Sequence, residues 1–382
     1  MSVATSSDPA QPDAAAAGTP GTGEDLVLTG VTKRFATFTA VDDLDLTVPQ
    51  GSFFALLGPS GCGKTTTLRM VAGLEEPTEG SIRLGQQDIT RLKPYKRPVN
   101  TVFQSYALFP HLTIADNVAF GLRRRGRKQV AEDVRRMLEL VELGDLAGRR
   151  PAQLSGGQQQ RVGGARALAA DPPILLMDEP FSAVDPVVRE ELQTEILRLQ
   201  DELHKTIVFV THDIDEAVKI GDRVAVFGRG GVLEQYDAPE RLLSNPANDF
   251  VAGFIGADRG YRGLQFRHAT GLPMHDLRVV AESGIDGLDL TAGQWALVTK
   301  PDGSPYGWID AAGVELHRSG NSLYDSTTAG GSLFRPDDSL RQALDAALSS
   351  PSGLGVAVDT GGEPIGGVLA TDVLEALQKQ RG

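Results

Sequence analysis

Residues 52–66 read SFFALLGPSGCGKTT, and this segment is the clearest indication of the fold. The apolar run at 52–57 predicts a buried strand, and TLRMVAGL at 67–74 predicts a helix. Between them, Gly58, Gly61 and Gly63 allow a tight turn whose backbone amides, with the helix N-terminus, face an anion. A strand, a glycine-rich turn and a helix in this order predict a cradle for a polyphosphate.

The side chains of the same turn indicate a nucleotide with its metal. Lys64 is placed to reach the terminal phosphates, and the hydroxyl of Thr65 can bind Mg²⁺. Cys62 can contribute its amide to the cradle, and we interpret its thiol as a small filler rather than a nucleophile. The predicted nucleotide-binding turn is completed by Pro59, Ser60 and Thr66.

Two further apolar runs end in residues suited to hydrolysis. The run at 174–177 predicts a strand that ends in Asp178 and Glu179. Asp178 would hold Mg²⁺ or its water, and Glu179 would polarise the attacking water. The run at 206–210 predicts another strand and is followed by His212, where an imidazole could contact the γ-phosphate. An ordinary acidic turn and a structural histidine are the alternatives for these positions taken singly.

A short sequence further along makes a family resemblance specific. LSGGQ at 154–158 resembles the signature motif of the ABC ATPase family. Gln104 in NTVFQSY resembles the Q-loop of that family, Asp185 in SAVD resembles its D-loop, and Phe35 stands where the family has an aromatic that stacks on adenine. The resemblance covers roughly residues 25–257, about two-thirds of the chain.

This resemblance implies a complete ATP site. ATP and Mg²⁺ are the implied cofactors, with Glu179, His212 and Gln104 as catalytic residues and Thr65, Gln104 and Asp178 around the metal. The small residues Ser155, Gly156 and Gly157, with Gln158, precede a helix and form a second anion site. In the family this second site completes the pocket of the opposite subunit, which implies a homodimer or a dimer with a paralogous ATPase.

Composition limits the partners and the compartment. The formal net charge is −13 at pH 7, so nucleic acid is an unsuitable partner, and Cys62 as the single cysteine fits a reducing compartment. Residues 1–24 have the composition of a disordered tail, and the sequence has no run of about 18 apolar residues. We therefore expect a peripheral protein on the cytoplasmic face of the cell membrane. The resemblance implies membrane permease subunits, met near residues 104–117, and a separate extracellular or periplasmic solute-binding protein.

The last third contains a duplication. VTKPDGSPYGWIDAAGV at 298–314 is echoed by VDTGGEPIGGVLATDV at 358–373, at an offset of about 59 residues. Each copy reads as strand, glycine turn, strand and helix, and residues 336–348 add an amphipathic helix ahead of the second copy. The second copy resembles a CBS motif. The first departs from it, because its leading helix is not visible and Gly313 stands where the second has Asp372.

We therefore expect an α/β fold. A P-loop NTPase of ABC ATPase type, with a parallel-sheet core, an antiparallel β subdomain and a helical subdomain, would occupy residues 25–257. Residues 258–275 would form a linker, and residues 276–382 a smaller α+β regulatory domain of tandem CBS-like units with the first degenerate.

Four functions fit these patterns. The first is the ATPase of an importer for a quaternary amine such as glycine betaine, choline or carnitine, because residues 245–265 and the tandem repeat resemble those subunits. The alternative is a polyamine or ferric-iron importer, which residues 95–122 resemble more. Alternatives of other classes are a non-transport ABC ATPase and a nucleotide or ionic-strength sensor. The ATPase subunit of a quaternary-amine importer is the main prediction.

Overall fold

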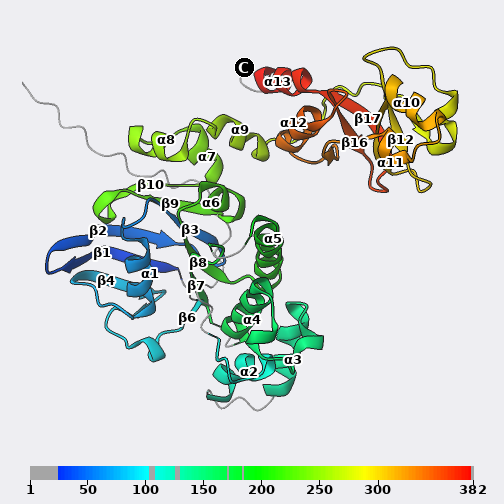
Figure 1. Cartoon of the computed structure of the whole chain (residues 1–382). Coiled ribbons are helices and arrows are strands. Elements are labelled where there is room, and N and C mark those ends of the chain that lie inside the picture. The colour runs from blue at the N-terminus through cyan, green and yellow to red at the C-terminus, as the bar shows by residue number, and fades with distance from the viewer. Residues whose placement is uncertain (1–24, 103–107, 125–129, 170–171, 183–184, 380–382) are drawn as a thin grey trace, which may run out of the picture. The chain divides into compact units, whose positions relative to one another are not determined.

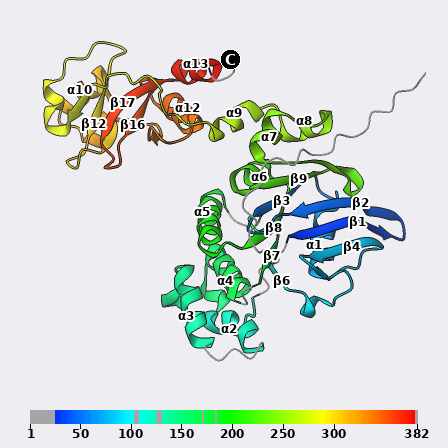
Figure 2. The same cartoon turned by 180° about the vertical axis from the view of Figure 1, so that it is seen from behind.

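The computed structural model describes residues 25–102, 108–124, 130–169, 172–182 and 185–379. These residues form two compact units, which are visible in Figures 1 and 2. The first contains residues up to Leu242 and Ala247–Phe254, and the second contains Leu243–Pro246 and the residues from Ile255 onward.

An antiparallel sheet opens the first unit. Its strands are β1 (Leu26–Phe35), β2 (Phe38–Val48), β4 (Glu79–Leu84) and β5 (Gln87–Asp88), in the order β2-β1-β4-β5. β1 pairs antiparallel with both β2 and β4 and buries Leu26, Leu28 and Val31 on one face. The predicted antiparallel region near Phe35 is therefore confirmed.

A mostly parallel sheet forms the centre of the same unit. Its strands are β10 (Leu233–Asp237), β9 (Arg223–Phe227), β3 (Phe53–Leu57), β8 (Thr206–Thr211), β7 (Ile174–Asp178) and β6 (Val99–Val102), in the order β10-β9-β3-β8-β7-β6. Only the β9–β10 pairing is antiparallel among the ladders of this sheet that the structure describes. Every residue of β3 and β8 is buried, which is why these strands have apolar runs without alternation.

Helices flank this sheet. Along residues 64–255 the described α-helices are α1 (Lys64–Ala72), α2 (Ile114–Arg124), α3 (Val130–Leu140), α4 (Gly156–Ala169), α5 (Pro186–Leu203), α6 (Ile214–Ile220), α7 (Pro239–Ser244) and α8 (Asp249–Ile255). α2 packs against α3 and α4, and the three lie together at one end of the unit in both views (Figures 1 and 2). This group corresponds to the predicted helical subdomain.

The second unit contains a structural repeat. The first copy comprises β11 (Val279–Ala281), the 3₁₀ helix η6 (Glu282–Gly287), β12 (Trp295–Thr299), β13 (Pro305–Asp310) and α10 (Ala311–Arg318). The second comprises β15 (Leu333–Phe334), α12 (Leu340–Ser349), β16 (Leu354–Val358), β17 (Pro364–Leu369) and α13 (Ala370–Lys379). Two short elements, α11 (Leu323–Ser326) and β14 (Thr328–Ala329), lie between the copies.

The two copies share their strand pairing as well as their element order. In each, the first strand pairs parallel with the second, which pairs antiparallel with the third. The last three elements of the second copy begin about 59 residues after their counterparts, as the sequence echo predicts. The first copy does have a helical segment at the leading position, and this segment is the 3₁₀ helix η6.

Residues 258–275 are predicted to form a linker, but the structure shows them folded. This segment contains α9 (Arg259–Gly263) and the 3₁₀ helix η5 (Leu264–Phe266). Its side chains Leu264, Ala269 and Leu272 are buried in the core of the second unit. These apolar residues are covered by the second copy of the repeat, so the segment is part of the unit rather than a connection to it.

Among the residues that the structure describes, no helix combines the length and apolar character needed to cross a lipid bilayer.

Candidate active site

Three neighbouring parallel strands bring the predicted site residues to one edge of the central sheet. β8 lies between β3 and β7, and the three run in the same direction. The turn at 58–66 follows β3, Asp178 ends β7, and His212 follows β8. Ligands of open α/β sheets bind at the carboxyl ends of such strands.

The turn after β3 is built around its lysine. Lys64 is 5% exposed, and its Nζ donates hydrogen bonds to the carbonyls of Gly58 at 2.7 Å and Pro59 at 2.9 Å. Gly63 ends the turn at φ 98°, where a Cβ would lie 2.3 Å from the carbonyl oxygen of Ala40. Any side chain at this position would be strained and would clash. The turn therefore needs glycine to begin α1 directly at Lys64.

Cys62 lies beneath the turn. It is 2% exposed, it belongs to the core of the first unit, and its Sγ lies 3.6 Å from Lys64 Nζ. A Cβ on Gly58 would come within 2.8 Å of that sulfur. The thiol therefore fills the space under the turn.

The turn and the end of β7 meet through one hydrogen bond. Thr65 Oγ1 donates to Asp178 Oδ1 at 3.0 Å, although 113 residues separate them. Burial raises the pKa of the Asp178 carboxyl above its ordinary value, and the hydrogen bond from Thr65 opposes this rise. A half-buried carboxylate beside a hydroxyl is an oxygen pair that suits Mg²⁺, whose charge would offset the cost of burying the anion.

Glu179 is held in an unusual backbone conformation. Its φ is 46°, a left-handed value that costs a residue other than glycine about 1 kcal/mol or more. Its amide donates to the carbonyl of Val210 in β8 at 3.1 Å, which fixes the turn to the neighbouring strand. Its Oε1 lies 3.3 Å from Nδ1 of His212. Strain of this kind concentrates at functional sites, and here it accompanies contact between two predicted catalytic residues.

The residues at 155–158 begin α4. The amide of Ser155 donates to Oε1 of Gln158 at 3.0 Å, and the amide of Gln158 donates to Oγ of Ser155 at 3.3 Å. This reciprocal pair is a capping box, and it explains why Gly156 and Gly157 can start a helix. Ser155, Gly157 and Gln158 line a cavity of about 250 Å³ whose other lining residues include none from the turn at 58–66.

The remaining predicted site residues are placed as follows. Phe35 ends β1, and 37% of its surface is exposed. Its ring stacks on that of Phe38, and Lys33 Nζ lies 4.9 Å from the centroid of the Phe35 ring. Asp185 is exposed and directly precedes α5. Gln104 lies outside the described residues.

The C-terminal end of α1 is held by a residue that no sequence motif indicates. Arg97 is 3% exposed, and its guanidinium donates to the carbonyls of Met70 at 2.6 Å and Val71 at 2.8 Å in the last turn of α1. It also donates to the carbonyls of Leu92 and Thr90, each at 2.8 Å. A cation at a helix C-terminus is favourable, but no local sequence pattern connects Arg97 to that helix.

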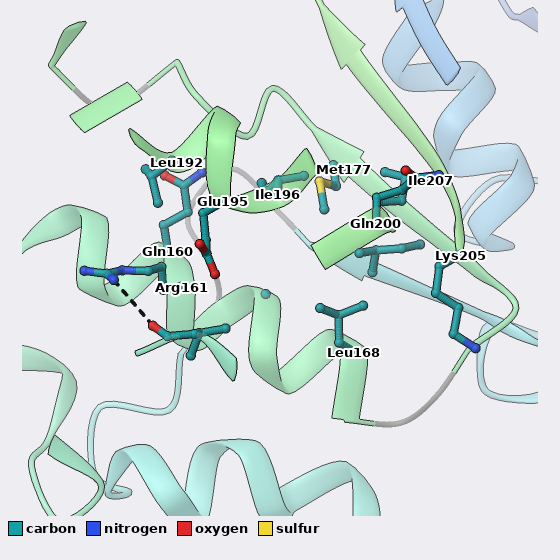
Figure 3. A pocket seen from close by; sticks show the side chains of 13 residues that line it. Gln160, Arg161, Leu168, Met177, Leu192, Glu195, Ile196, Gln200, Lys205 and Ile207 are labelled. Atoms are coloured by element: carbon teal, nitrogen blue, oxygen red, sulfur yellow. Dashed lines mark hydrogen bonds between the residues drawn. The ribbon is translucent and has the colours of Figure 1, made fainter. Parts of the chain in front are cut away.

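A second, apolar cavity adjoins the one beside Ser155 and shares Arg161, Leu192 and Glu195 with it. It has about 40 Å³ and is lined from α4, α5, β7 and β8 by residues that include Leu168, Met177 and Ile196 (Figure 3). Near it, Arg161 Nη1 donates to the carbonyl of Val141 at 3.4 Å. None of its lining residues belongs to the turn at 58–66, so it is separate from the phosphate-binding turn.

The turn at 58–66, its lysine and the threonine–aspartate contact on a parallel sheet define a P-loop nucleoside triphosphatase. The family model described as "ABC transporter" matches residues 41–182. The spermidine/putrescine import ATP-binding protein PotA of Thermobifida fusca is 50% identical over 273 residues, which are 70% of this chain and 71% of that relative. The chain belongs to the ABC transporter ATP-binding family.

Other relatives carry the same description. The PotA proteins of Pseudomonas aeruginosa (strain UCBPP-PA14) and Rubrobacter xylanophilus are 53% and 54% identical over 233 and 231 residues. These matches cover 60% of this chain in both cases, and 64% and 61% of the two relatives.

Solved structures agree on the fold. An ATP-binding cassette of an ABC transporter aligns with a TM-score of 0.55 at 24% identity, covering 60% of this chain and 99% of that one. A dimeric ATP-binding cassette in a post-hydrolysis state, bound to ADP and Pi, aligns with a TM-score of 0.50 at 34% identity, covering 56% and 98%. The predicted ABC ATPase fold is confirmed.

Proposed function

We propose that this chain is the ATP-hydrolysing subunit of a polyamine importer and that it acts peripherally at the cytoplasmic face of the cell membrane. The observation that supports the hydrolytic part most directly is the pair of contacts at the sheet edge. Thr65 meets Asp178, and Glu179 meets His212. The partners would be membrane permease subunits and a separate solute-binding protein, as the family resemblance implies.

Each residue of the edge has a separate task in this proposal. The amides of the turn and Lys64 bind the phosphates, while Thr65 and Asp178 would hold Mg²⁺, which neutralises charge on the phosphate oxygens. Glu179 orients a water and accepts its proton. His212, in contact with Glu179, would lie toward the terminal phosphate. Gln104 would complete the metal site, and Phe35 would stack on the adenine.

A second copy of an ATPase subunit would complete each ATP site. In the proposal, Ser155, Gly156, Gly157 and Gln158 face the nucleotide held by the partner subunit. Two observations support this. The cavity beside Ser155 is lined by no residue of the turn at 58–66, and a related cassette is dimeric with ADP and Pi bound.

The choice of polyamine replaces the main prediction from the sequence. The relatives from Thermobifida, Pseudomonas and Rubrobacter are described as spermidine/putrescine import proteins, which favours the alternative over a quaternary amine. The quaternary-amine prediction rested mainly on the fold of the C-terminal repeat, and a fold alone does not specify a substrate.

An uptake assay tests the substrate. In a strain that lacks this chain, we expect loss of radiolabelled spermidine or putrescine uptake and normal uptake of glycine betaine and ferric iron. The wild-type chain should restore uptake, and Glu179→Gln should not. Normal polyamine uptake together with loss of glycine betaine uptake would contradict the proposal and reinstate the quaternary amine.

We propose in addition that the second unit is a regulatory domain with tandem CBS-like units. The strand, helix, strand, strand, helix order of both copies supports this. The copies are not equivalent at one position. Oδ2 of Asp372 accepts one hydrogen bond from the Leu369 amide at 2.8 Å and lies 2.9 Å from Nε2 of His275. A Cβ on Gly313, by contrast, would lie 2.2 Å from the Ser326 carbonyl oxygen. Packing therefore excludes an aspartate at position 313, the counterpart of Asp372 in the first copy.

Titration calorimetry of the full chain with AMP, ADP and ATP tests the regulatory proposal. We expect a binding event that survives Lys64→Ala and disappears in Asp372→Ala. A single event that Lys64→Ala abolishes would contradict a nucleotide-sensing role for the second unit.

A further inference from the structure

His212 stands between Thr211 and Asp213 in the chain. Hydrogen bonds connect both of these neighbours to the buried residue Glu216. On one side, Thr211 Oγ1 donates to Glu216 Oε2 at 2.6 Å, and both residues are nearly inaccessible, with exposures of 2% and 6%. On the other side, the amide of Asp213 donates to the same threonine oxygen at 3.0 Å. The backbone that carries the imidazole is therefore tied at both neighbouring positions to Glu216.

Asp213 adds a second fixed point. It is the N-cap of α6, and its Oδ1 accepts from the amides of Asp215 at 2.8 Å and Glu216 at 3.4 Å. Because the cap fixes the start of α6, it also fixes Glu216 in the first turn beneath Thr211. The network therefore holds the residues on both sides of His212.

An arginine connects this network to another helix. Arg189 of α5 places Nη1 3.6 Å from Asp213 Oδ2 and 3.8 Å from Glu216 Oε1. Its own amide donates to the carbonyl of Asp185 at 2.9 Å, in the first turn of the helix. The same residue therefore contacts the segment that carries Asp185 and the segment that carries His212.

Stability alone does not account for such an arrangement. Burying a carboxylate costs free energy that a partly buried ion pair seldom recovers, and apolar residues in its place are often as stable. Glu216 shows this cost, because its burial raises its pKa even though Thr211 and Arg189 act in the opposite direction.

We propose that Arg189 and Glu216 are positioning residues, which hold His212 against Glu179 and connect that contact to the start of α5. The inference rests on the proposed roles of Glu179 and His212 in ATP hydrolysis. Neither Arg189 nor Glu216 needs to touch the nucleotide. Loosening the network should let the imidazole leave the carboxylate while the turn that binds the phosphates stays intact.

The same two helices provide a matched control. Lys219 of α6 and Glu190 of α5 form an ion pair at 3.4 Å, but the glutamate is 76% exposed and is separate from Thr211 in the contacts of the described residues. Glu190→Gln therefore removes a charge pair between α5 and α6 without disturbing the network around His212.

Steady-state ATPase measurements on the full chain test the proposal. For Glu216→Gln and Arg189→Met we expect kcat to fall about tenfold while KM for ATP stays within about twofold, because phosphate binding is untouched. Arg189→Lys should recover part of kcat, since it keeps the cation. Glu190→Gln should behave as wild type.

A spectroscopic readout separates positioning from loss of folded protein. The chain has six histidines, and the Hε1 resonance of His212 can be assigned with a His212→Gln variant. We expect this resonance to shift in Glu216→Gln and Arg189→Met and to stay in place in Glu190→Gln. If Glu216→Gln does not fold, Arg189→Met and Arg189→Lys still test the proposal, because Arg189 is partly exposed.

The outcomes are distinct. Wild-type kcat and an unmoved resonance in both variants would overturn the positioning role. If the same variants keep kcat while Glu179→Gln loses turnover, only the inference fails. If Glu179→Gln retains turnover, the proposed hydrolytic role fails and the inference with it.

Discussion

Nδ1 of His212 lies 3.3 Å from Oε1 of Glu179, across 33 residues of sequence. Two neighbouring parallel strands bring them together, because β7 and β8 are paired in register with Asp178 opposite Val210. Each of the two residues follows the end of its strand, so the contact is a direct consequence of sheet topology. It joins the residue proposed to activate water to the residue proposed to lie toward the phosphate.

The Thr65–Asp178 contact predicts how Mg²⁺ is bound. Thr65→Val keeps the side-chain shape but removes the oxygen, so we expect the Mg²⁺ concentration for half-maximal ATPase activity to rise about tenfold or more. Thr65→Ser, which keeps the hydroxyl, should stay near wild type. An unchanged Mg²⁺ dependence in Thr65→Val would exclude this residue from the metal site.

Arg97 is expected to be essential for stability. Arg97→Met would leave buried carbonyls in α1 and in residues 90–92 without their donor, and we expect a loss of about 3 kcal/mol or more in the free energy of unfolding. Arg83→Met is the control, since exposed Arg83 makes one hydrogen bond to the carbonyl of Gln86. Urea unfolding would measure both, and equal effects would contradict the anchoring role.

Gly164 offers a stabilising substitution. It lines the apolar cavity of about 40 Å³, it lies inside α4, and a Cβ there would meet no atom within 4 Å. Alanine should therefore raise the free energy of unfolding by about 1 kcal/mol, because it favours the helix and begins to fill the cavity. Gly313→Ala should have the opposite effect through its clash with Ser326. A Gly164→Ala variant with a lower free energy of unfolding than wild type would contradict this prediction.

Glu216 predicts a pH dependence. Burial raises its pKa in the folded state above the ordinary value of 4.5, so the folded state binds the proton more tightly than the unfolded state. Its contribution to stability is complete below 4.5 and is lost as the pH rises through the folded-state pKa. The stability of wild type relative to Glu216→Gln should therefore decrease with rising pH in that interval. Urea unfolding at a series of pH values measures this difference. Free energies of unfolding that change with pH by the same amount in both proteins would contradict the prediction.

Much of the site follows from the sequence because its parts are local. The turn at 58–66 is bounded by a buried strand and a helix, and a strand ending in two carboxylates is readable without knowledge of the fold. Parallel pairing then places the strand ends together. The same locality makes the capping box of Ser155 and Gln158 visible, since it needs only residues three apart.

Other features depend on contacts between distant segments. Arg97 caps α1 from 27 residues away, and Arg189 reaches Glu216 from another helix. The sequence predicts a linker at 258–275, yet Leu264 and Leu272 are core residues that the second copy of the repeat covers. Nothing within those segments indicates their tertiary partners.

Single-turnover ATP hydrolysis by purified Glu179→Gln is the most direct test of the proposed active site. We expect ATP affinity within about threefold of wild type, because the phosphate contacts remain, and a hydrolysis rate reduced by about 100-fold or more, because the amide cannot accept a proton from water. Glu190→Gln is the matched control and should hydrolyse normally. Hydrolysis by Glu179→Gln within about threefold of the wild-type rate would contradict the assignment of Glu179 as the residue that activates water.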